Sequence, residues 1–337
     1  MLAPFFHSWE RRLADVANNR VVRPFDWGHD WFCAGQEAGD LEQYVARVLN
    51  DTDSFYTPAP TDSYELRPAA NDEPALLSFP SARSTPHPEN NTVYARYFRA
   101  RANRGTRRAV VVLPQWNSDP GGHVGLARLL AYFGMSALRL SLPYHDRRMP
   151  PELTRADYIV SANLARTLEV CRQAVLDARR AIWWLRRQGY ERIGILGTSL
   201  GSCLAMLTAA HEPLIRAQAL NHISPFFADV VWRGLSTRHV RAGLDGHIGL
   251  ERLRRLWMPI SPWHFLDRIA DRRTLLVYAR YDLTFPVDLS RDLVREFRRR
   301  RIPHELAVLP CGHYSTGAAP FKYLDGYVLT RFLHRNL

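Results

Sequence analysis

Lysine is almost absent from this chain of 337 residues: Lys322 is the one lysine among 45 basic residues, and all the others are arginine. The formal net charge is +12 at pH 7. The arginines are spread along the whole sequence, and no nucleic-acid-binding module or interleaving of basic with aromatic residues accompanies them. We therefore expect no nucleic-acid partner. An anionic substrate, or peripheral contact with an anionic membrane surface, stays open beside a plain basic surface.

Long apolar runs and paired cysteines are also missing. No run approaches the roughly 20 apolar residues of a membrane-spanning helix, and the first residues lack the pattern of a secretory signal. The four cysteines, among them Cys33 and Cys311, form no C-x-x-C pair and no metal-binding spacing. Cys171 and Cys203 fall in apolar helical runs, so we expect buried thiols in a reducing compartment. These absences predict a cytoplasmic protein that needs no metal and no cofactor.

One stretch joins an apolar strand, a serine between glycines and an Ala-rich helix. Residues 193–196 have strand character, residues 200–210 have helix character, and Gly197-x-Ser199-x-Gly201 lies between them. This order is typical of a nucleophile elbow, in which a strained turn lifts the serine above the sheet edge. A Cβ at either glycine would collide with the neighbouring strand or helix. Ser199 is the candidate nucleophile, and a plain glycine-rich turn in a doubly wound sheet is the alternative.

Strand and helix patterns alternate from residue 92 to the end of the chain. This alternation predicts an α/β fold, with a mostly parallel central sheet and helices on both faces. The carboxyl ends of such strands share one edge, where ligands bind. We predict strands at 92–98, 109–113, 136–142, 193–196, 217–220, 274–279 and 305–309, and helices at 124–133, 164–188, 200–210, 289–300 and 324–334.

The rest of the chain is predicted to surround this alternating region. Residues 1–90 form an N-terminal extension, residues 91–337 the main domain, and residues 224–271 a small helical cap inserted above the ligand edge. Residues 2–17 predict an amphipathic helix with Phe5, Trp9, Leu13 and Val16 on its apolar face. We favour packing of this helix across the domain, with a lid or a membrane-surface helix as the alternatives.

A nucleophilic serine needs a general base, and the base needs an orienting carboxylate. In proteins with a nucleophile elbow of this kind, the order along the chain is serine, acid and then histidine, and the acid follows a strand after the elbow. Asp282 lies just beyond the predicted strand 274–279. Asp288 is its competitor, but it begins the next helix, where an acid suits the first turn. We therefore predict Asp282 as the acid.

The base should follow the last strand. His313 comes directly after the predicted strand 305–309 and a glycine that permits a turn. His304 lies at the wrong end of that strand, and His334 lies in the terminal helix. We predict His313 as the base.

The negative oxygen of an acyl-transfer intermediate needs two hydrogen-bond donors. One should be the backbone N–H of Leu200. The other should come from the loop after strand 109–113, where Pro114 has no N–H and leaves Gln115 or Trp116. Further residues near the ligand edge are candidates for lining the substrate pocket: Asn117, Tyr144, His145 and Trp232.

These residues resemble the α/β-hydrolase superfamily over residues 92–337. The resemblance rests on Gly197-Thr198-Ser199-Leu200-Gly201, Asp282 and Gly312-His313. It implies Ser199 as nucleophile, His313 as base and Asp282 as acid. Members are mostly esterases, lipases, thioesterases and peptidases. One departure leaves the second oxyanion donor open, because many relatives carry His-Gly where this chain has Pro114-Gln115.

A narrower resemblance involves segments outside these motifs. Phe25-Asp26-Trp27-Gly28, residues 142–150 and the cap from Trp232 to Trp257 are similar to the branch named α/β-hydrolase domain-containing protein 18 and its bacterial relatives. The sequence as a whole predicts a serine hydrolase that cleaves a small-molecule carboxylic ester, with a lipid or another apolar acyl ester among the candidates. A peptidase or amidase is one alternative, and a catalytically silent binding protein is another.

Overall fold

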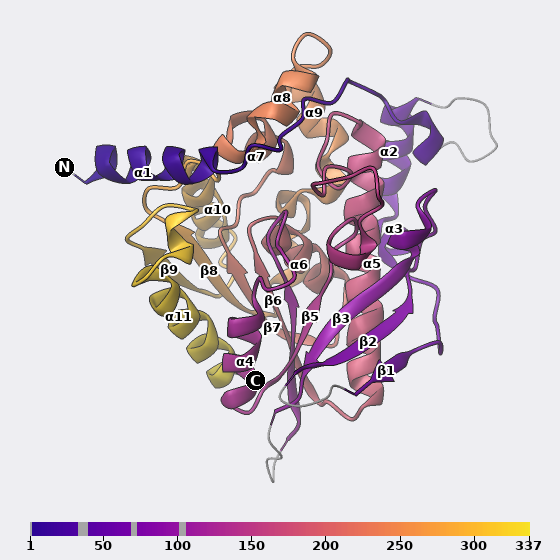
Figure 1. The fold of residues 1–337 in the computed structure, drawn as a ribbon, viewed down its shortest axis with the longest axis vertical. Coiled ribbons are helices and arrows are strands. Elements are labelled where there is room, and N and C mark those ends of the chain that lie inside the picture. The colour runs from indigo at the N-terminus through magenta and orange to yellow at the C-terminus, as the bar shows by residue number, and fades with distance from the viewer. Residues whose placement is uncertain (1, 33–39, 69–72, 101–105) are drawn as a thin grey trace.

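The computed structural model describes residues 2–32, 40–68, 73–100 and 106–337 (Figure 1). A sheet of nine strands, counted over these ranges, forms its centre in the order β1-β2-β3-β5-β4-β6-β7-β8-β9. From β5 to β9 the neighbouring strands are parallel, whereas β1, β2 and β3 pair antiparallel with their neighbours. The strands are β1 (Glu65–Arg67), β2 (Ala75–Pro80), β3 (Thr92–Phe98), β4 (Arg108–Leu113), β5 (Ser136–Leu140), β6 (Arg192–Thr198), β7 (Ile215–Asn221), β8 (Arg273–Ala279) and β9 (His304–Leu309).

Helices cover both faces of this sheet. The helices are α1 (Ala3–Asp15), α2 (Leu41–Asn50), α3 (Thr52–Tyr56), α4 (Val124–Tyr132), α5 (Leu164–Arg187), α6 (Leu200–His211), α7 (Phe227–Arg233), α8 (Arg238–Leu244), α9 (Leu250–Leu256), α10 (Val287–Arg299) and α11 (Phe321–Asn336). Val110 of β4 packs in a core with α4 and α11, and its neighbour Val111 packs in a second core with α5 and α6. Because both faces are buried, β4 has an apolar run without alternation, and every residue of β5 is buried. The predicted α/β fold class is confirmed.

The helix α1 forms where it is expected but buries a different face. Its buried residues are Phe6, Glu10 and Ala14, whereas Phe5 is 58% exposed and Val16 77% exposed. The predicted apolar face is therefore wrong. The reason is its partner: α1 packs against the loop after β9, whose backbone N–H groups face a carboxylate on the helix. The ring of Phe6 stacks on Tyr281, with 4.6 Å between the ring centres.

The N-terminal 90 residues are interwoven with the rest of the chain. Strand β2 pairs with β3, for example Ala75 with Tyr97, so the division predicted at residues 90/91 falls inside one sheet. The short helix α3 also lies within the predicted N-terminal extension. The segment of residues 16–32, which follows α1, packs on α8 at Arg23, where a Cβ added at Gly243 would lie 2.2 Å from the carbonyl oxygen of Arg23. In Figure 1 this segment crosses the cap helices α7–α9 above the sheet.

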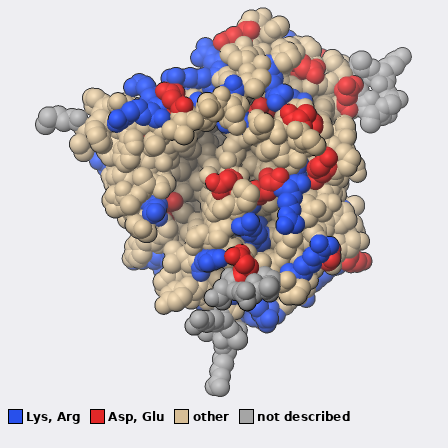
Figure 2. All heavy atoms as spheres, in the orientation of Figure 1, with Lys and Arg blue, Asp and Glu red and all other residues tan. Residues whose placement is uncertain are grey.

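The charged side chains and two of the cysteines lie where the sequence leads us to expect them. Basic and acidic side chains are interspersed over the described part of the face shown in Figure 2. Cys171, Cys203 and Cys311 are free and buried, as predicted for the first two, and Cys33 lies outside the described residues. Within the described ranges, no helix combines the length and the hydropathy that would let it cross a bilayer.

Candidate active site

Ser199 lies on a sharp turn between β6 and α6. Its backbone has φ +56° and ψ −121°, a left-handed conformation that a residue with a Cβ rarely adopts. A Cβ added at Gly197 would lie 1.9 Å from the carbonyl oxygen of Gly201, and one at Gly201 would lie 2.2 Å from that of Leu113. The two glycines thus permit the close packing of α6 on β4 and β6, as the motif predicts.

The other two predicted residues meet Ser199 at the carboxyl edge of the sheet. The hydroxyl of Ser199 lies 3.1 Å from Nε2 of His313, and Nδ1 of His313 lies 2.9 Å from Oδ2 of Asp282. Ser199 is 7% exposed and Asp282 3% exposed, so little water competes for these contacts. The competitor Asp288 lies on α10 and pairs with Arg233 at the surface.

Asp282 is held by donors on both carboxylate oxygens. Its Oδ1 accepts the backbone N–H groups of Thr284 and Phe285, at 2.8 and 2.7 Å. Burial alone would raise the pKa of Asp282, but His313 and His222 outweigh it and hold that pKa well below its usual range. An ionised Asp282 accepts the Nδ1–H of His313. The Nε2 atom of His313 then carries a free electron pair toward Ser199, as a general base requires.

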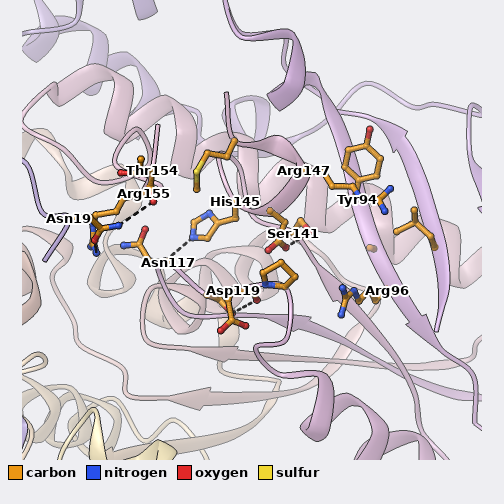
Figure 3. A pocket seen from close by; sticks show the side chains of 16 residues that line it. Asn19, Tyr94, Arg96, Asn117, Asp119, Ser141, His145, Arg147, Thr154 and Arg155 are labelled. Carbon is orange, nitrogen blue, oxygen red and sulfur yellow. Dashed lines mark hydrogen bonds between the residues drawn. The ribbon is translucent and has the colours of Figure 1, made fainter. Parts of the chain in front are cut away.

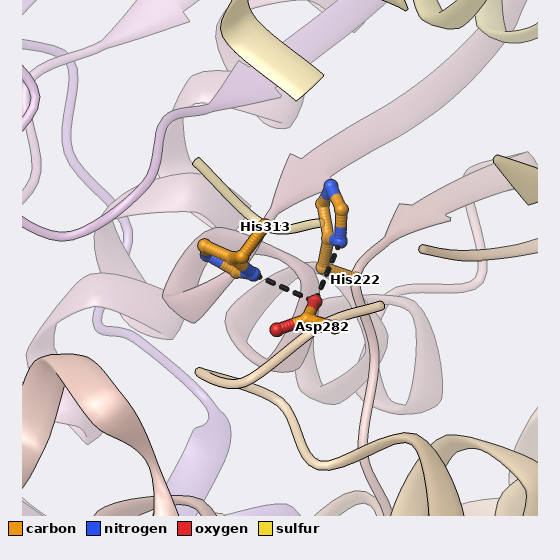
Figure 4. Close-up of side chains that lie close together, drawn as sticks. All are labelled: His222, Asp282 and His313. Atoms are coloured by element: carbon orange, nitrogen blue, oxygen red, sulfur yellow. Dashed lines mark hydrogen bonds and ion pairs between the residues drawn. The ribbon is translucent and has the colours of Figure 1, made fainter. Parts of the chain in front are cut away.

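A second histidine contacts the same carboxylate, and the sequence did not reveal it. Figure 4 shows His222 and His313 on two sides of Asp282, and Nδ1 of His222 lies 3.1 Å from Oδ2. Burial first, and then the charge of His313, lower the pKa of His222, so it is a neutral donor. It follows β7 directly, in the left-handed region at φ +57°. Its position just after a predicted strand is the one sequence signal that could have pointed to His222.

The three side chains His222, Asp282 and His313 also have the spacing of metal ligands, with ligand atoms within 4.8 Å of one another. Two hydrogen bonds account for this spacing, since each imidazole donates Nδ1–H to the same carboxylate oxygen. Using Nδ1 of His313 as a ligand would remove the proton that binds Asp282. The donor set therefore fits an acid–base relay better than a metal site.

Glu10 of α1 supports the loop that carries His313. Its carboxylate is fully buried and accepts the N–H groups of Tyr314 and Ser315, at 2.8 and 2.9 Å, and the hydroxyl of Ser315 at 2.8 Å. Gly312 leaves room for it, because a Cβ there would lie 2.2 Å from Cδ of Glu10. Burial lowers the pKa of His313, but Asp282 and the charge of Glu10 raise it more, so the net shift is upward.

The loop after β4 contains the candidate oxyanion donors. Trp116 lines a cavity together with Ser199 and Leu200, whereas Gln115 does not line that cavity. The backbone of the loop is fixed by His145, whose Nε2 accepts the N–H of Asn117 at 2.9 Å. The Nδ1–H of His145 donates to the carbonyl of Pro143, and burial lowers the pKa of His145 to about 4. His145 is therefore a neutral support of the loop.

The cavity beside Ser199 is small and mostly apolar, with a volume of about 50 Å³. Loops and cap helices form its wall: Trp116, Val160, Ser199, Leu200, Cys203, Ser224, Phe226, Phe227, Val230, Val231, Ser236, Thr237, Pro262 and Phe285. None of the four predicted pocket residues belongs to this wall.

The four residues lie elsewhere for identifiable reasons. Asn117 and His145 line a separate cavity of about 580 Å³ (Figure 3). Tyr144 is fully buried and its hydroxyl contacts His87, because its loop folds back onto Asn90. The ring of Trp232 lies under the guanidinium of Arg241 on the cap.

No model of a known protein family matches this sequence, and no curated protein matches it. Solved structures do resemble it. An acylaminoacyl peptidase from Pyrococcus horikoshii matches 81% of this chain with 14% identity and a TM-score of 0.59. Since the match covers 42% of that peptidase, this chain spans less than half of its length. An acetyl xylan esterase from Paenibacillus sp. R4 matches over 97% of this chain and 99% of its own, with 15% identity and a TM-score of 0.62.

The protein has the α/β-hydrolase fold. An acetyl xylan esterase from Thermoanaerobacterium sp. JW/SL YS485 agrees, with a TM-score of 0.59 and 15% identity over 96% of this chain and 98% of its own. The wider resemblance drawn from the sequence is thus confirmed at the level of the α/β-hydrolase fold. The comparisons give no support to the narrower resemblance to the α/β-hydrolase domain-containing protein 18 branch.

Proposed function

We propose that this protein is a serine hydrolase that cleaves carboxylic esters with a short acyl group. The observation that carries the proposal is the 3.1 Å contact between Ser199 Oγ and His313 Nε2, on a strained elbow beside a small cavity. The buried Asp282, which binds the other nitrogen of His313, supports the same interpretation. A serine, a histidine and an aspartate in hydrogen-bonded series activate a hydroxyl that is otherwise a poor nucleophile.

In the proposed reaction, His313 carries a proton from Ser199 to the leaving alcohol. Ser199 Oγ attacks the ester carbonyl while Nε2 of His313 takes its proton, and Asp282 stabilises the imidazolium. The N–H of Leu200, at the amino end of α6, donates to the oxyanion with a second N–H from Trp116 or Gln115. His313 then protonates the leaving alcohol, and water activated by the same histidine releases the acid from the acyl-enzyme.

The volume of the cavity beside Ser199 favours a short acyl group. One bound water takes roughly 10–15 Å³ of such a cavity, so a volume of about 50 Å³ holds a group of a few heavy atoms. A cavity of this size suits an acetyl or propionyl group better than the chain of a long lipid ester. The fold shared with two acetyl xylan esterases over nearly their whole length is consistent with this choice.

A peptidase or amidase is the second candidate, because acylaminoacyl peptidases share the fold. The two acetyl xylan esterases are matched over 99% and 98% of their own length, whereas that peptidase is matched over 42%. We therefore prefer the ester.

Hydrolysis of p-nitrophenyl acetate, butyrate and decanoate, and of p-nitroacetanilide, tests the proposal. We expect kcat/KM for the acetate to exceed that for the decanoate by at least about tenfold, and the anilide to be the poorer substrate. The variant Ser199→Ala should abolish turnover, and Ser63→Ala, at an exposed serine, is the matched control. Folded protein that turns over none of these esters would favour the silent binding protein, and a preference for the anilide would favour the amidase.

A further inference from the structure

Basic side chains gather around Trp116. The guanidinium carbon of Arg155 lies 5.2 Å from the centre of the Trp116 ring, and the imidazole of His239 stacks on the same ring at 5.7 Å. Arg20 donates to the hydroxyl of Tyr314, the residue after His313, at 3.4 Å. Segments from the N-terminus and the loop before α5 thus bring positive charge to the predicted site, and the cap adds the imidazole of His239.

This charge is only partly compensated. Asp157 pairs with Arg23 at 3.1 Å and with Arg155 at 3.5 Å, and over the described ranges it is the one carboxylate that pairs with Arg20, Arg23 or Arg155. Three guanidinium groups therefore share one negative charge. Arg155 is 9% exposed, so water screens this surplus poorly.

Several donors in this group are also left without a partner. His239 is 8% exposed, and neither of its ring nitrogens has a hydrogen-bond partner among the described residues. The same holds for the buried Nε of Arg20, again counting partners within the described chain. Burial, followed by the charges of Arg155, Arg20 and Arg23, lowers the pKa of His239 to about 4, so a neutral ring offers one N–H. Buried polar atoms are normally paired, and these are the atoms that an anion would satisfy.

The larger cavity gives access to Arg155, which lines it, whereas Arg20 and His239 lie beside Arg155 and line neither cavity. Its volume is about 580 Å³, and Figure 3 shows Arg155, Asn19 and Thr154 together at one end, with Asn117 beside them. Trp116 lines the small cavity and its neighbour Asn117 lines the large one. Trp116 also contacts Arg155, so the alcohol group of an ester whose acyl group fills the small cavity would extend past Trp116 to reach Arg155.

We propose that Arg155, Arg20 and His239 bind an anionic group, a carboxylate or a phosphate, carried by the leaving alcohol of the ester. A guanidinium fork binds either oxyanion through two parallel N–H groups, and the neutral His239 adds a third donor. Because the apolar small cavity takes the acyl group, we place the anionic group on the leaving alcohol. This inference rests on the proposed esterase function.

The test compares an anionic ester with a neutral ester of the same shape. The substrates are 4-acetoxybenzoate and 4-acetoxybenzamide, with 4-acetoxyphenyl phosphate as a second anion. Each is assayed with the wild type, with Arg155→Gln and with Arg216→Gln, a control at an exposed arginine near the start of β7. Comparing variant with wild type for each substrate cancels the intrinsic reactivity of the esters.

We expect Arg155→Gln to lower kcat/KM for an anionic ester at least about tenfold more than for the neutral ester, as loss of a charged hydrogen-bond pair predicts, and Arg216→Gln to change the two equally. The anion with the larger differential loss is the class that the site prefers. Equal losses for all three esters in Arg155→Gln overturn the inference while leaving the esterase function intact.

A binding measurement separates the two proposals. The anionic product 4-hydroxybenzoate should raise the Tm of wild-type protein more than 4-hydroxybenzamide does, and this difference should vanish in Arg155→Gln. Wild type that binds the anion selectively but cleaves no ester would refute the esterase function alone. Absence of any selective shift in wild type would contradict the anion site itself.

Discussion

The elbow that carries Ser199 and the loop that carries His313 are built in opposite ways. The elbow is held by its own neighbours, since Gly197 and Gly201 let the strand and the following helix approach within a few ångströms. The loop of His313 is held from the other end of the chain, by the buried carboxylate of Glu10. The proposed nucleophile is thus encoded by five consecutive residues, whereas the position of the proposed base depends on packing between distant segments.

The largest effect should come from removing either reacting group. Ser199→Ala and His313→Ala should each lower kcat by about 10³-fold to 10⁶-fold, and the double variant should be no worse than either single one, because the groups act as a unit. Steady-state kinetics on p-nitrophenyl acetate measures this. Independent, multiplicative losses would show that the two residues do not act together.

Breaking the elbow should destabilise the whole protein. Gly201→Ala places a Cβ 2.2 Å from the carbonyl oxygen of Leu113, and backbone atoms must shift, so we expect a loss of about 2–4 kcal/mol in the free energy of unfolding. Urea denaturation monitored by circular dichroism checks this. Gly249→Ala is the control, because nothing lies within 4 Å of its added Cβ. Equal stability of both variants would mean that α6 does not need the close approach.

Removing the carboxylate that supports the loop of His313 should lower both the catalytic rate and the stability of the protein. Glu10→Ala leaves three buried donors, on Tyr314 and Ser315, without their acceptor. We expect a loss of about 2–3 kcal/mol in stability and of about 10-fold to 100-fold in kcat, because His313 loses its position. Asp15→Ala, at an exposed acid of the same helix, is the control. Full kcat in a folded Glu10→Ala variant would show that the loop holds its own shape.

The smallest expected effect is a shift in pH dependence. His313 acts as a base only when neutral, and its pKa is raised above the usual value of about 6.5, in part by the charge of Glu10. Removing that charge in Glu10→Gln should lower the pKa of His313 and move the acid limb of the kcat/KM profile to lower pH. A limb that stays in place, or moves to higher pH, would show that Glu10 does not act through its charge.

The same contrast explains what could be predicted from the sequence. Ser199, Asp282 and His313 follow strands whose apolar runs and glycine turns are local signals, and the parallel sheet brings strand ends together. Glu10 could not be found in this way, because a helix pattern does not reveal that a carboxylate will meet backbone N–H groups 304 residues later.

Two other misses have related causes. His222 belongs to no motif, and its contact with Asp282 depends on the register of β7 and β8. The predicted pocket residues Tyr144 and His145 follow a strand as expected, but the backbone N–H of Tyr144 donates to Asn90 and the imidazole of His145 donates to the carbonyl of Pro143. A position after a strand therefore indicates the edge of the sheet but not the direction of a side chain.

Fluorophosphonate labelling followed by peptide mass spectrometry tests the activated serine most directly. We predict a single adduct on Ser199 in wild-type protein, none in Ser199→Ala, and labelling at least about 100-fold slower in His313→Ala, as loss of a general base requires. An adduct on another residue, an unchanged rate in His313→Ala, or no labelling of folded wild type would contradict the account.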